Sequence, residues 1–187
     1  DYYHTEALYY LITQRKLSFI EAMIELDNTN SNEALAISKG CTREEILGLN
    51  EHQIRTLCEL RGYDWCNQGL TGFDLRELDW FNSEEHRLAM ITLTSTEKGN
   101  LQPDKALIEM ADLDCEQLKL MYKCGLRRDD VTGLNPLGCE TVKYLCESGF
   151  TLKISEISTL LRQSTWLDSD NHHALLRKMI ETKNLSL

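Results

Sequence analysis

One short pattern occurs four times along this chain. Each copy contains an amphipathic segment, closes on apolar residues flanked by charges, and stops at or beside Gly or Asp. The copies are residues 5–27 (TEALYYLITQRKLSFIEAMIELD), 50–63 (NEHQIRTLCELRGY), 106–125 (ALIEMADLDCEQLKLMYKCG) and 138–150 (GCETVKYLCESGF). Self-similarity at a period of roughly 20 to 50 residues is typical of stacked supersecondary units. The pattern therefore favours a helical array, an architecture that usually binds other proteins.

A second internal match is closer. Residues 125–135 (GLRRDDVTGLN) restate residues 40–50 (GCTREEILGLN) almost position for position: Gly, Arg, two acids, a β-branched residue and Gly-Leu-Asn. We interpret the shared Gly-Leu-Asn as a turn that joins one helical unit to the next.

Local signals predict helices throughout. A polar break at Gln14–Lys16 predicts two short helices within residues 5–27, and Gly40 predicts the end of a helix over 33–39. Thr42 followed by Glu45 is a capping box, and residues 82–85 are a second start signal. No hairpin or βαβ pattern occurs, so the sequence predicts an all-α fold, a helical-repeat array (α-solenoid) of about six helix-turn-helix pairs.

The chain is predicted to form a single helical-repeat domain over residues 1–187. Polar residues 94–103 divide it into sub-arrays of about 1–93 and 104–187. Because it starts at Asp1 rather than Met, we expect a fragment of a longer chain.

The units resemble ankyrin repeats. The match rests on apolar and terminating positions: Val142, Leu145 and Gly149; Ala106-Leu107, Ala111, Leu118, Met121 and Gly125; and Thr5, Leu8, Leu11, Phe19-Ile20 and Met23-Ile24, with Asp27 where Gly is usual. The Thr-Pro-Leu-His opening of that family is absent. The resemblance implies a degenerate ankyrin-like scaffold for protein binding. Divergent arrays of this kind also occur among effectors that intracellular bacteria deliver into host cells, so it implies a secreted effector as a further hypothesis.

Charge and composition narrow the class of partner. The formal net charge of −10 disfavours binding to nucleic acid and to anionic membranes, and it is compatible with a basic protein partner. No apolar run approaches the roughly 18 residues of a membrane span. Seven cysteines without a compact framework indicate a reducing compartment, hence the cytoplasm, or the host cytoplasm for an effector.

Large aromatic residues lie among acids in the middle of the chain. Trp and Tyr are enriched at interface hot spots. The default interpretation is that the acids form a solvated face and that Trp80 and Phe81 lie in the core. The sharper hypothesis is a docking strip for a basic partner, formed by Tyr63, Asp64, Trp65, Asp74, Asp79, Trp80 and Glu84.

Candidate chemistry is weaker. Cys139 and Cys146 fit packed thiols better than metal ligands, because no second Cys pair accompanies them. His172 and His173 point to different helix faces, which favours a solvated cap, and His52 is predicted to make a hydrogen bond within a turn. We expect no catalytic residue, metal or cofactor. Two alternatives stay open: a helical accessory part of an enzyme whose active site lies partly outside this chain, and a plain helical bundle.

Overall fold

The computed structural model describes residues 1–61, 70–95, 99–148, 154–164 and 169–182. Every regular element in those ranges is an α-helix, which confirms the all-α prediction. The elements are α1 (Tyr2–Thr13), α2 (Phe19–Leu26), α3 (Ser31–Ser38), α4 (Arg43–Ile46), α5 (Glu51–Leu60), α6 (Gly72–Arg76), α7 (Glu84–Thr94), α8 (Pro103–Met110), α9 (Cys115–Cys124), α10 (Arg128–Val131), α11 (Pro136–Glu147), α12 (Ile154–Gln163) and α13 (Asp170–Glu181).

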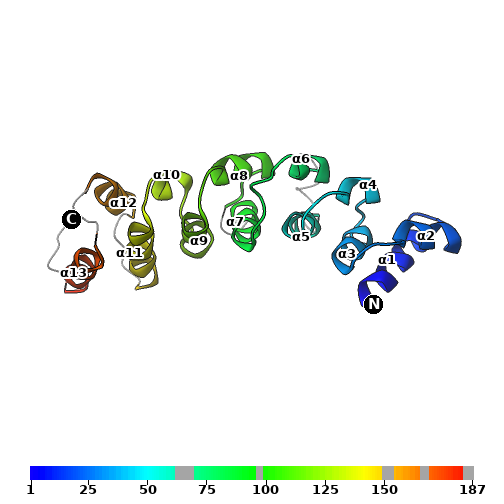
Figure 1. The fold of residues 1–187 in the computed structure, drawn as a ribbon, viewed down its shortest axis with the longest axis horizontal. Helices are drawn as coiled ribbons and strands as arrows, with labels where there is room; N and C mark the ends of the chain where they lie inside the picture. The colour runs from blue at the N-terminus through cyan, green and yellow to red at the C-terminus, as the bar shows by residue number, and fades with distance from the viewer. Residues whose placement is uncertain (62–69, 96–98, 149–153, 165–168, 183–187) are drawn as a thin grey trace.

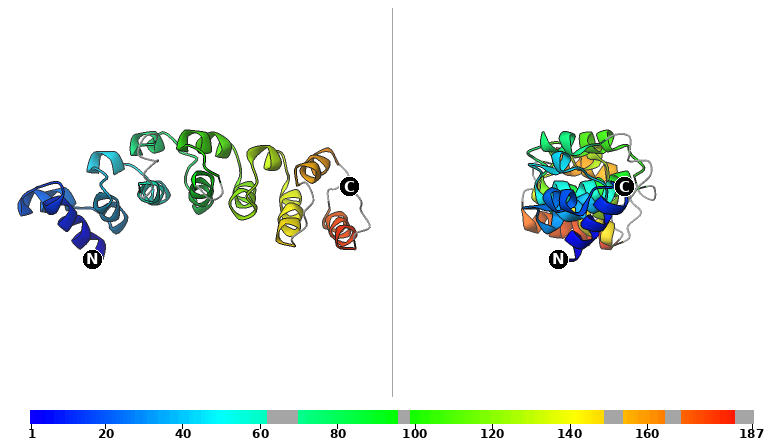
Figure 2. Two further views of the ribbon diagram at one scale, coloured as in Figure 1. Left: turned by 180° about the vertical axis from the view of Figure 1, so that it is seen from behind. Right: turned by 90° about the vertical axis from the view of Figure 1, so that its right-hand side faces the viewer.

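The helices lie in two rows. The odd-numbered helices form one row, in which α1 contacts α3, α3 contacts α5, and so on to α13. The even-numbered helices form the second row, and several of them are only one turn long. The rows make an elongated arch with the odd-numbered helices on its inner side and the two chain ends far apart (Figures 1 and 2).

The predicted start and stop signals are confirmed. The polar residues 14–16 separate α1 from α2, and Thr42 and Glu45 form a capping box at α4. Gly40 follows α3 with φ +90°, and Gly125 follows α9 with φ +70°, both in the left-handed region that glycine adopts without a Cβ penalty. The helix boundaries therefore follow local side-chain chemistry.

Backbone features recur 82 to 86 residues apart. The left-handed Gly40 and Gly48 correspond to Gly125 and Gly133, each 85 residues later. N-caps recur in the same way, as the first turns of α1, α7 and α13 show. Asp1, Ser83 and Ser169 precede these helices, and each accepts a hydrogen bond from the backbone N–H of a histidine three residues on, namely His4, His86 and His172. The match between residues 40–50 and 125–135 is thus part of a longer correspondence.

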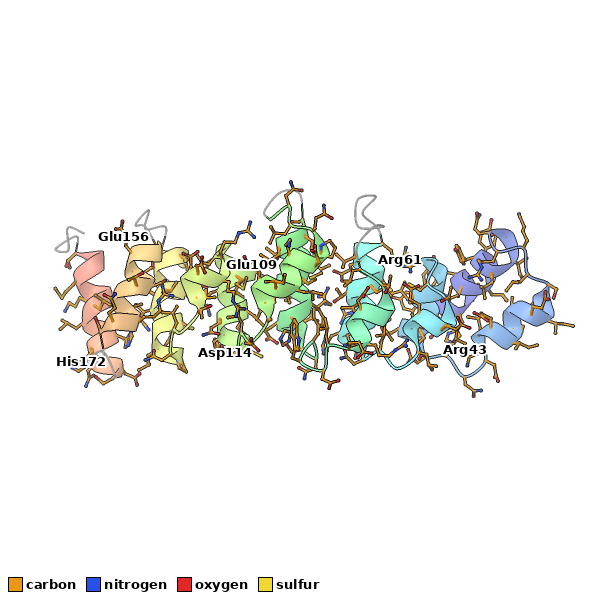
Figure 3. All side chains as sticks on the ribbon, turned by 90° about the horizontal axis from the view of Figure 1, so that it is seen from above. Arg43, Arg61, Glu109, Asp114, Glu156 and His172 are labelled. Atoms are coloured by element: carbon orange, nitrogen blue, oxygen red, sulfur yellow. The ribbon has the colours of Figure 1, made fainter. Side chains whose placement is uncertain are left out.

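Arginines join consecutive even-numbered helices. The Arg43 guanidinium in α4 donates to the carbonyls of Ile24, Glu25 and Asp27 at the end of α2, at 3.2, 3.1 and 2.8 Å (Figure 3). Arg128 in α10 donates likewise to carbonyls at the end of α8.

Two further arginines make the same contact. Arg76 in α6 donates to the carbonyls of Glu44 and Glu45 in α4, and Arg162 in α12 donates to those of Asp129 and Thr132 at α10. The last carbonyls of a helix have no intrahelical donor and favour positive charge, so each guanidinium fastens one short helix to the next.

Two hydrophobic clusters form the core. One lies between α1 and α6 and includes Leu11, Ile37 and Leu57; the other runs from α5 to α12 and includes Phe81 and Leu118. Leu70 and Leu78 pack against both clusters, so the apolar interior continues between them.

The outer surface of α2 differs from the sequence interpretation. Phe19, Ile20, Met23 and Ile24 belong to the apolar pattern of the sequence, yet their exposed fractions are 60, 71, 49 and 64%. The helix buries Ala22 and Leu26 instead. The periodicity was right for a helix, but α2 is the last helix of its row and nothing among the described residues covers this side.

Candidate interaction site

The predicted docking strip is only partly within the described residues. Tyr63, Asp64 and Trp65 lie outside them. Asp74 is exposed and accepts hydrogen bonds from the backbone N–H and hydroxyl of Thr71, at 2.8 and 2.7 Å, so its carboxylate caps α6.

Asp79 and Trp80 lie in the turn before α7. Asp79 is exposed, whereas Trp80 is half-buried with its ring 5.9 Å from Phe81 and 5.3 Å from His86, centroid to centroid. Phe81 is fully buried, as the core interpretation of this pair predicts. The strip therefore keeps one free carboxylate beside a partly accessible indole.

Glu84 is held in an ion-pair network between α5 and α7. The Arg87 side chain, 10% exposed, bonds to the carboxylates of Glu84 and Glu59. This bonding lowers the pKa of Glu84 to about 2. The ring of His52 lies 3.5 Å from Glu84, so the predicted hydrogen bond of His52 within its own turn is replaced by a contact across two helices. Glu84 thus links helices and is not a free docking charge.

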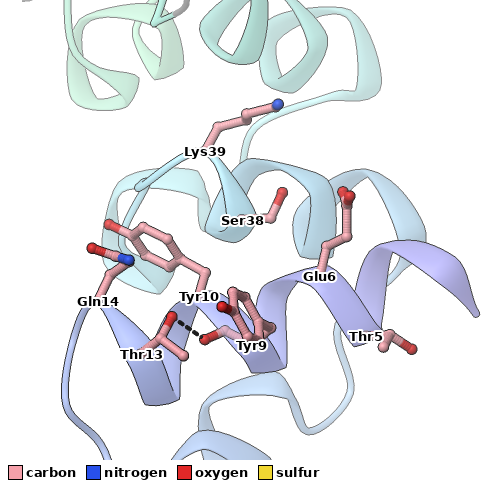
Figure 4. A pocket seen from close by; sticks show the side chains of 8 residues that line it. All are labelled: Thr5, Glu6, Tyr9, Tyr10, Thr13, Gln14, Ser38 and Lys39. Carbon is pink, nitrogen blue, oxygen red and sulfur yellow. Dashed lines mark hydrogen bonds between the residues drawn. The ribbon is translucent and has the colours of Figure 1, made fainter.

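A hollow lies between α1 and α3 (Figure 4). Its volume is about 520 Å³, it is open to solvent, and its walls mix aromatic rings, hydroxyls and one charge of each sign. The lining residues are Thr5, Glu6, Tyr9, Tyr10, Thr13, Gln14, Ser38 and Lys39. None of them belongs to the strip predicted from the sequence.

Backbone contacts shape this hollow. Tyr9 is 70% exposed, and its carbonyl accepts a 2.7 Å hydrogen bond from Thr13 Oγ1. A Cβ at Gly40 would lie 3.1 Å from the Tyr10 hydroxyl, so the missing side chain makes room for that ring. The sequence signal was present as the Tyr9-Tyr10 pair, but α1 and α3 had to be placed side by side to form the second wall.

The thiols and histidines show packing roles. Cys139 is buried, which raises its pKa to about 12, in agreement with a packed thiol. Cys124 in α9 and Cys146 in α11 are hydrogen-bonded to each other; that bond lowers the pKa of Cys124 and raises that of Cys146. His173 is buried with Nδ1 2.6 Å from Thr141 Oγ1, so the predicted solvated cap is wrong for this residue, because α13 packs on α11.

The described residues contain no group of three or more His, Cys, Asp or Glu side chains arranged to hold a metal ion. They also contain no helix with the length and apolar character needed to cross a membrane. Comparison of the chain with protein-family models, curated proteins and solved structures returned no match. The resemblance to ankyrin repeats and the effector role that it implies stay predictions.

Proposed function

We propose that this chain is a protein–protein interaction module built as a helical-repeat array of degenerate ankyrin-like pairs. The spacing of the joining arginines supports the repeat: Arg76 follows Arg43 by 33 residues, and Arg162 follows Arg128 by 34. The ankyrin unit is about 33 residues long. The successive contacts of odd-numbered helices, each with the next, are those expected when units stack on their neighbours.

The observation that carries the binding role is the hollow between α1 and α3. An exposed tyrosine is a good anchor for a protein partner, because it offers a large rigid surface and a polar tip at low entropic cost. Tyr9 stands at this hollow 70% exposed, with a carboxylate and an ammonium group, Glu6 and Lys39, on the rim. Such a surface suits a segment of a partner protein that presents a side chain to the hollow.

The acidic strip at Asp74, Asp79 and Trp80 is the second candidate surface for the same function. Asp74 is exposed but caps α6, whereas Asp79 is exposed with a free carboxylate and directly precedes the half-buried Trp80. A basic segment of the partner would complement these charges. The two surfaces can be separated by mutation, since they lie on α1 and near α6.

The test is capture of a partner by the wild-type chain, followed by titration calorimetry with the purified partner. We expect Tyr9→Ala to weaken binding about 30-fold, the effect of losing a hot spot of about 2 kcal/mol. Ile108→Ala, which also truncates an exposed apolar side chain (61%), is the control and should bind as the wild type does.

The variant Asp79→Asn tests the acidic strip, because it removes the free carboxylate and leaves the Asp74 cap of α6 intact. If it loses affinity while Tyr9→Ala does not, the partner binds the strip rather than the hollow. Full affinity in both variants would contradict the proposed binding surfaces.

A further inference from the structure

Two cysteines are in contact across the interface between α9 and α11. Cys124 is the last residue of α9, Cys146 is the last but one of α11, and the two helices lie side by side (Figure 1). Both thiols are free, and the two side chains are hydrogen-bonded to each other. A disulfide forms between cysteines whose side chains point toward one another. The folded chain therefore holds this pair of thiols in an arrangement that favours a bond between them.

Small molecules can reach the pair from solution. Cys124 and Cys146 are half-buried at the edge of the hydrophobic cluster that runs from α5 to α12. Gly125, which follows Cys124, is exposed, and a Cβ placed on it would meet no atom within 4 Å. Glu147 and Ser148, which follow Cys146, are exposed as well. Open space thus lies next to both cysteines along the chain.

The other described cysteines do not combine contact with access. Cys115 is exposed, but it stands at the opposite end of α9 from Cys124. Three more are buried, and burial raises the pKa of each thiol: Cys41, Cys58 and Cys139. Cys66 lies outside the described residues. Within the described part of the chain, the α9–α11 pair is thus the place where two accessible thiols meet.

Corresponding positions of the array carry charged side chains. Eighty-five residues earlier, Lys39 corresponds to Cys124 and Arg61 to Cys146. The Arg61 guanidinium donates to the Gly40 carbonyl at 2.8 Å, which connects the end of α5 to the turn after α3. Two thiols stand where that interface uses a charged contact, so the packing of neighbouring helices does not by itself call for cysteine at these places.

The surroundings of the pair distinguish its two thiols. The hydrogen bond from the Cys146 S–H lowers the pKa of Cys124, and the ammonium groups of Lys143 and Lys123 act in the same direction against burial and Glu147. The same hydrogen bond raises the pKa of Cys146, and burial adds to this rise. Because the thiolate is the nucleophilic form of cysteine, Cys124 is the thiol that attacks first. Cys146 lies beside it and reacts second.

We propose that Cys124 and Cys146 form a reversible disulfide between α9 and α11 by exchange with a small disulfide of the glutathione type. The Cys124 thiolate attacks one sulfur of oxidised glutathione, which expels a glutathione thiolate and leaves a mixed disulfide on Cys124. The expelled thiolate takes the proton of Cys146, whose sulfur then attacks the Cys124 sulfur and expels a second glutathione thiolate. The chain loses two electrons, and oxidised glutathione is reduced to two glutathione molecules.

The cross-link joins two neighbouring helices of the array and encloses α10. It spans 22 positions of the sequence, so it restricts the unfolded chain. The oxidised chain should therefore unfold at a higher urea concentration than the reduced chain, and dithiothreitol should reverse the shift.

The test is equilibration of the folded 187-residue chain in glutathione buffers of rising oxidised fraction, followed by acid quenching and tryptic mass spectrometry without reduction. Trypsin cleaves after Lys and Arg, so Cys124 falls in the peptide CGLR (124–127) and Cys146 in YLCESGFTLK (144–153), each with a single cysteine. These two peptides should become disulfide-linked at a lower oxidised fraction than any other pair of cysteine peptides. Dithiothreitol should separate them.

Serine variants separate the roles of the two thiols. Cys146→Ser should accumulate a glutathione adduct on Cys124, because the second thiol is missing. Cys124→Ser should take up glutathione on Cys146 about tenfold more slowly, since the raised pKa of Cys146 leaves less thiolate. Cys115→Ser removes an exposed thiol and is the matched control, which should form the Cys124–Cys146 link as the wild type does.

Two results would overturn the proposal. One is a wild-type chain in which Cys124 and Cys146 stay reduced, or carry only separate glutathione adducts, in fully oxidised buffer. The other is a link that forms equally well in urea-unfolded chain, which would mean that the contact between α9 and α11 does not favour it. Neither result bears on partner binding at Tyr9, which the calorimetric test measures separately.

Discussion

Helices α2 and α8 belong to the same row and begin 84 residues apart, α2 at the end of the row and α8 inside it. Their buried positions agree: Ala22 and Ala106 are fully buried, and Leu26 and Met110 are 7 and 0% exposed. An arginine from the following even-numbered helix caps both, Arg43 for α2 and Arg128 for α8. The inward side of the two helices is therefore built in the same way.

Their outward sides differ. Where α8 has a buried Pro103 and an exposed Asp104, α2 has Phe19 and Ile20 at 60 and 71% exposure. Part of the difference is position, because nothing among the described residues precedes α2 in its row. The rest is sequence, because α2 carries an apolar side chain where the interior helix carries a charge. The outward side of α2 therefore carries apolar residues typical of a contact surface, although no described residue of this chain packs against it.

The largest expected effect is a difference in stability between two methionine-to-alanine substitutions, one at a buried position of α8 and one at an exposed position of α2. Met110→Ala should lower the free energy of unfolding by about 2–5 kcal/mol, because it removes a fully buried side chain and leaves a cavity. Met23→Ala, at a side chain 49% exposed, should cost under about 0.5 kcal/mol. Urea denaturation of both variants measures the difference. Equal losses of unfolding free energy would mean that the exposed side of α2 is covered in solution.

An intermediate loss of stability is expected when the arginine contacts between even-numbered helices are removed. Arg128→Ala should destabilise the chain by about 1–2 kcal/mol, because the carbonyls at the end of α8 lose a charged donor inside the array. Arg43→Ala should cost less, since α2 can fray at the end of its row without disturbing a second neighbour.

Hydrogen exchange shows where each arginine acts. Faster exchange should be confined to α2 in Arg43→Ala and should reach α10 and α8 in Arg128→Ala. Arg15→Ala, at an exposed arginine in the turn after α1, is the control and should leave stability unchanged. If Arg128→Ala behaves like Arg15→Ala, the guanidinium contacts do not join the even-numbered helices.

The smallest expected effect is a pH-dependent change in stability that depends on Glu84, in the ion-pair network between α5 and α7. The pKa of Glu84 is about 2 in the folded chain, below the usual 4.5, because Arg87 bonds to the carboxylate. A depressed folded-state pKa adds stability that is present above pH 4.5 and is lost as the pH falls toward 2. Glu84→Gln should therefore cost under about 1 kcal/mol at pH 7, since the carboxylate is partly exposed, and the gap to wild type should close by pH 2. A gap that does not change with pH would contradict the ion-pair assignment.

Local sequence signals predicted most of the helix boundaries. The polar break at residues 14–16, the Thr42 capping box and the left-handed Gly40 and Gly125 all lie where the sequence placed them. Each depends on hydrogen bonds or backbone freedom within a few residues, which is why a single sequence contains the information. No start signal was identified for the short α6, although Thr71 and Asp74 form a capping box there.

The candidate surfaces were harder to predict. The tyrosines of the α1–α3 hollow were visible as a pair, but the wall opposite them comes from Ser38 and Lys39 on another helix. Glu84 looked like a free acid in the sequence and is held by Arg87 and His52. Such contacts join residues that are distant along the chain, so the periodicity of the sequence does not predict them.

The sequence by itself determined that this chain is helical, where most of its helices begin and end, and that residues 40–50 have a counterpart at 125–135, because capping, turn geometry and amphipathic spacing act over a few residues. Only the tertiary structure decided which apolar faces are covered. Pro103 of α8 is buried and Phe19, at the corresponding position of α2, is exposed, because burial requires a neighbouring helix and none among the described residues precedes α2 in its row.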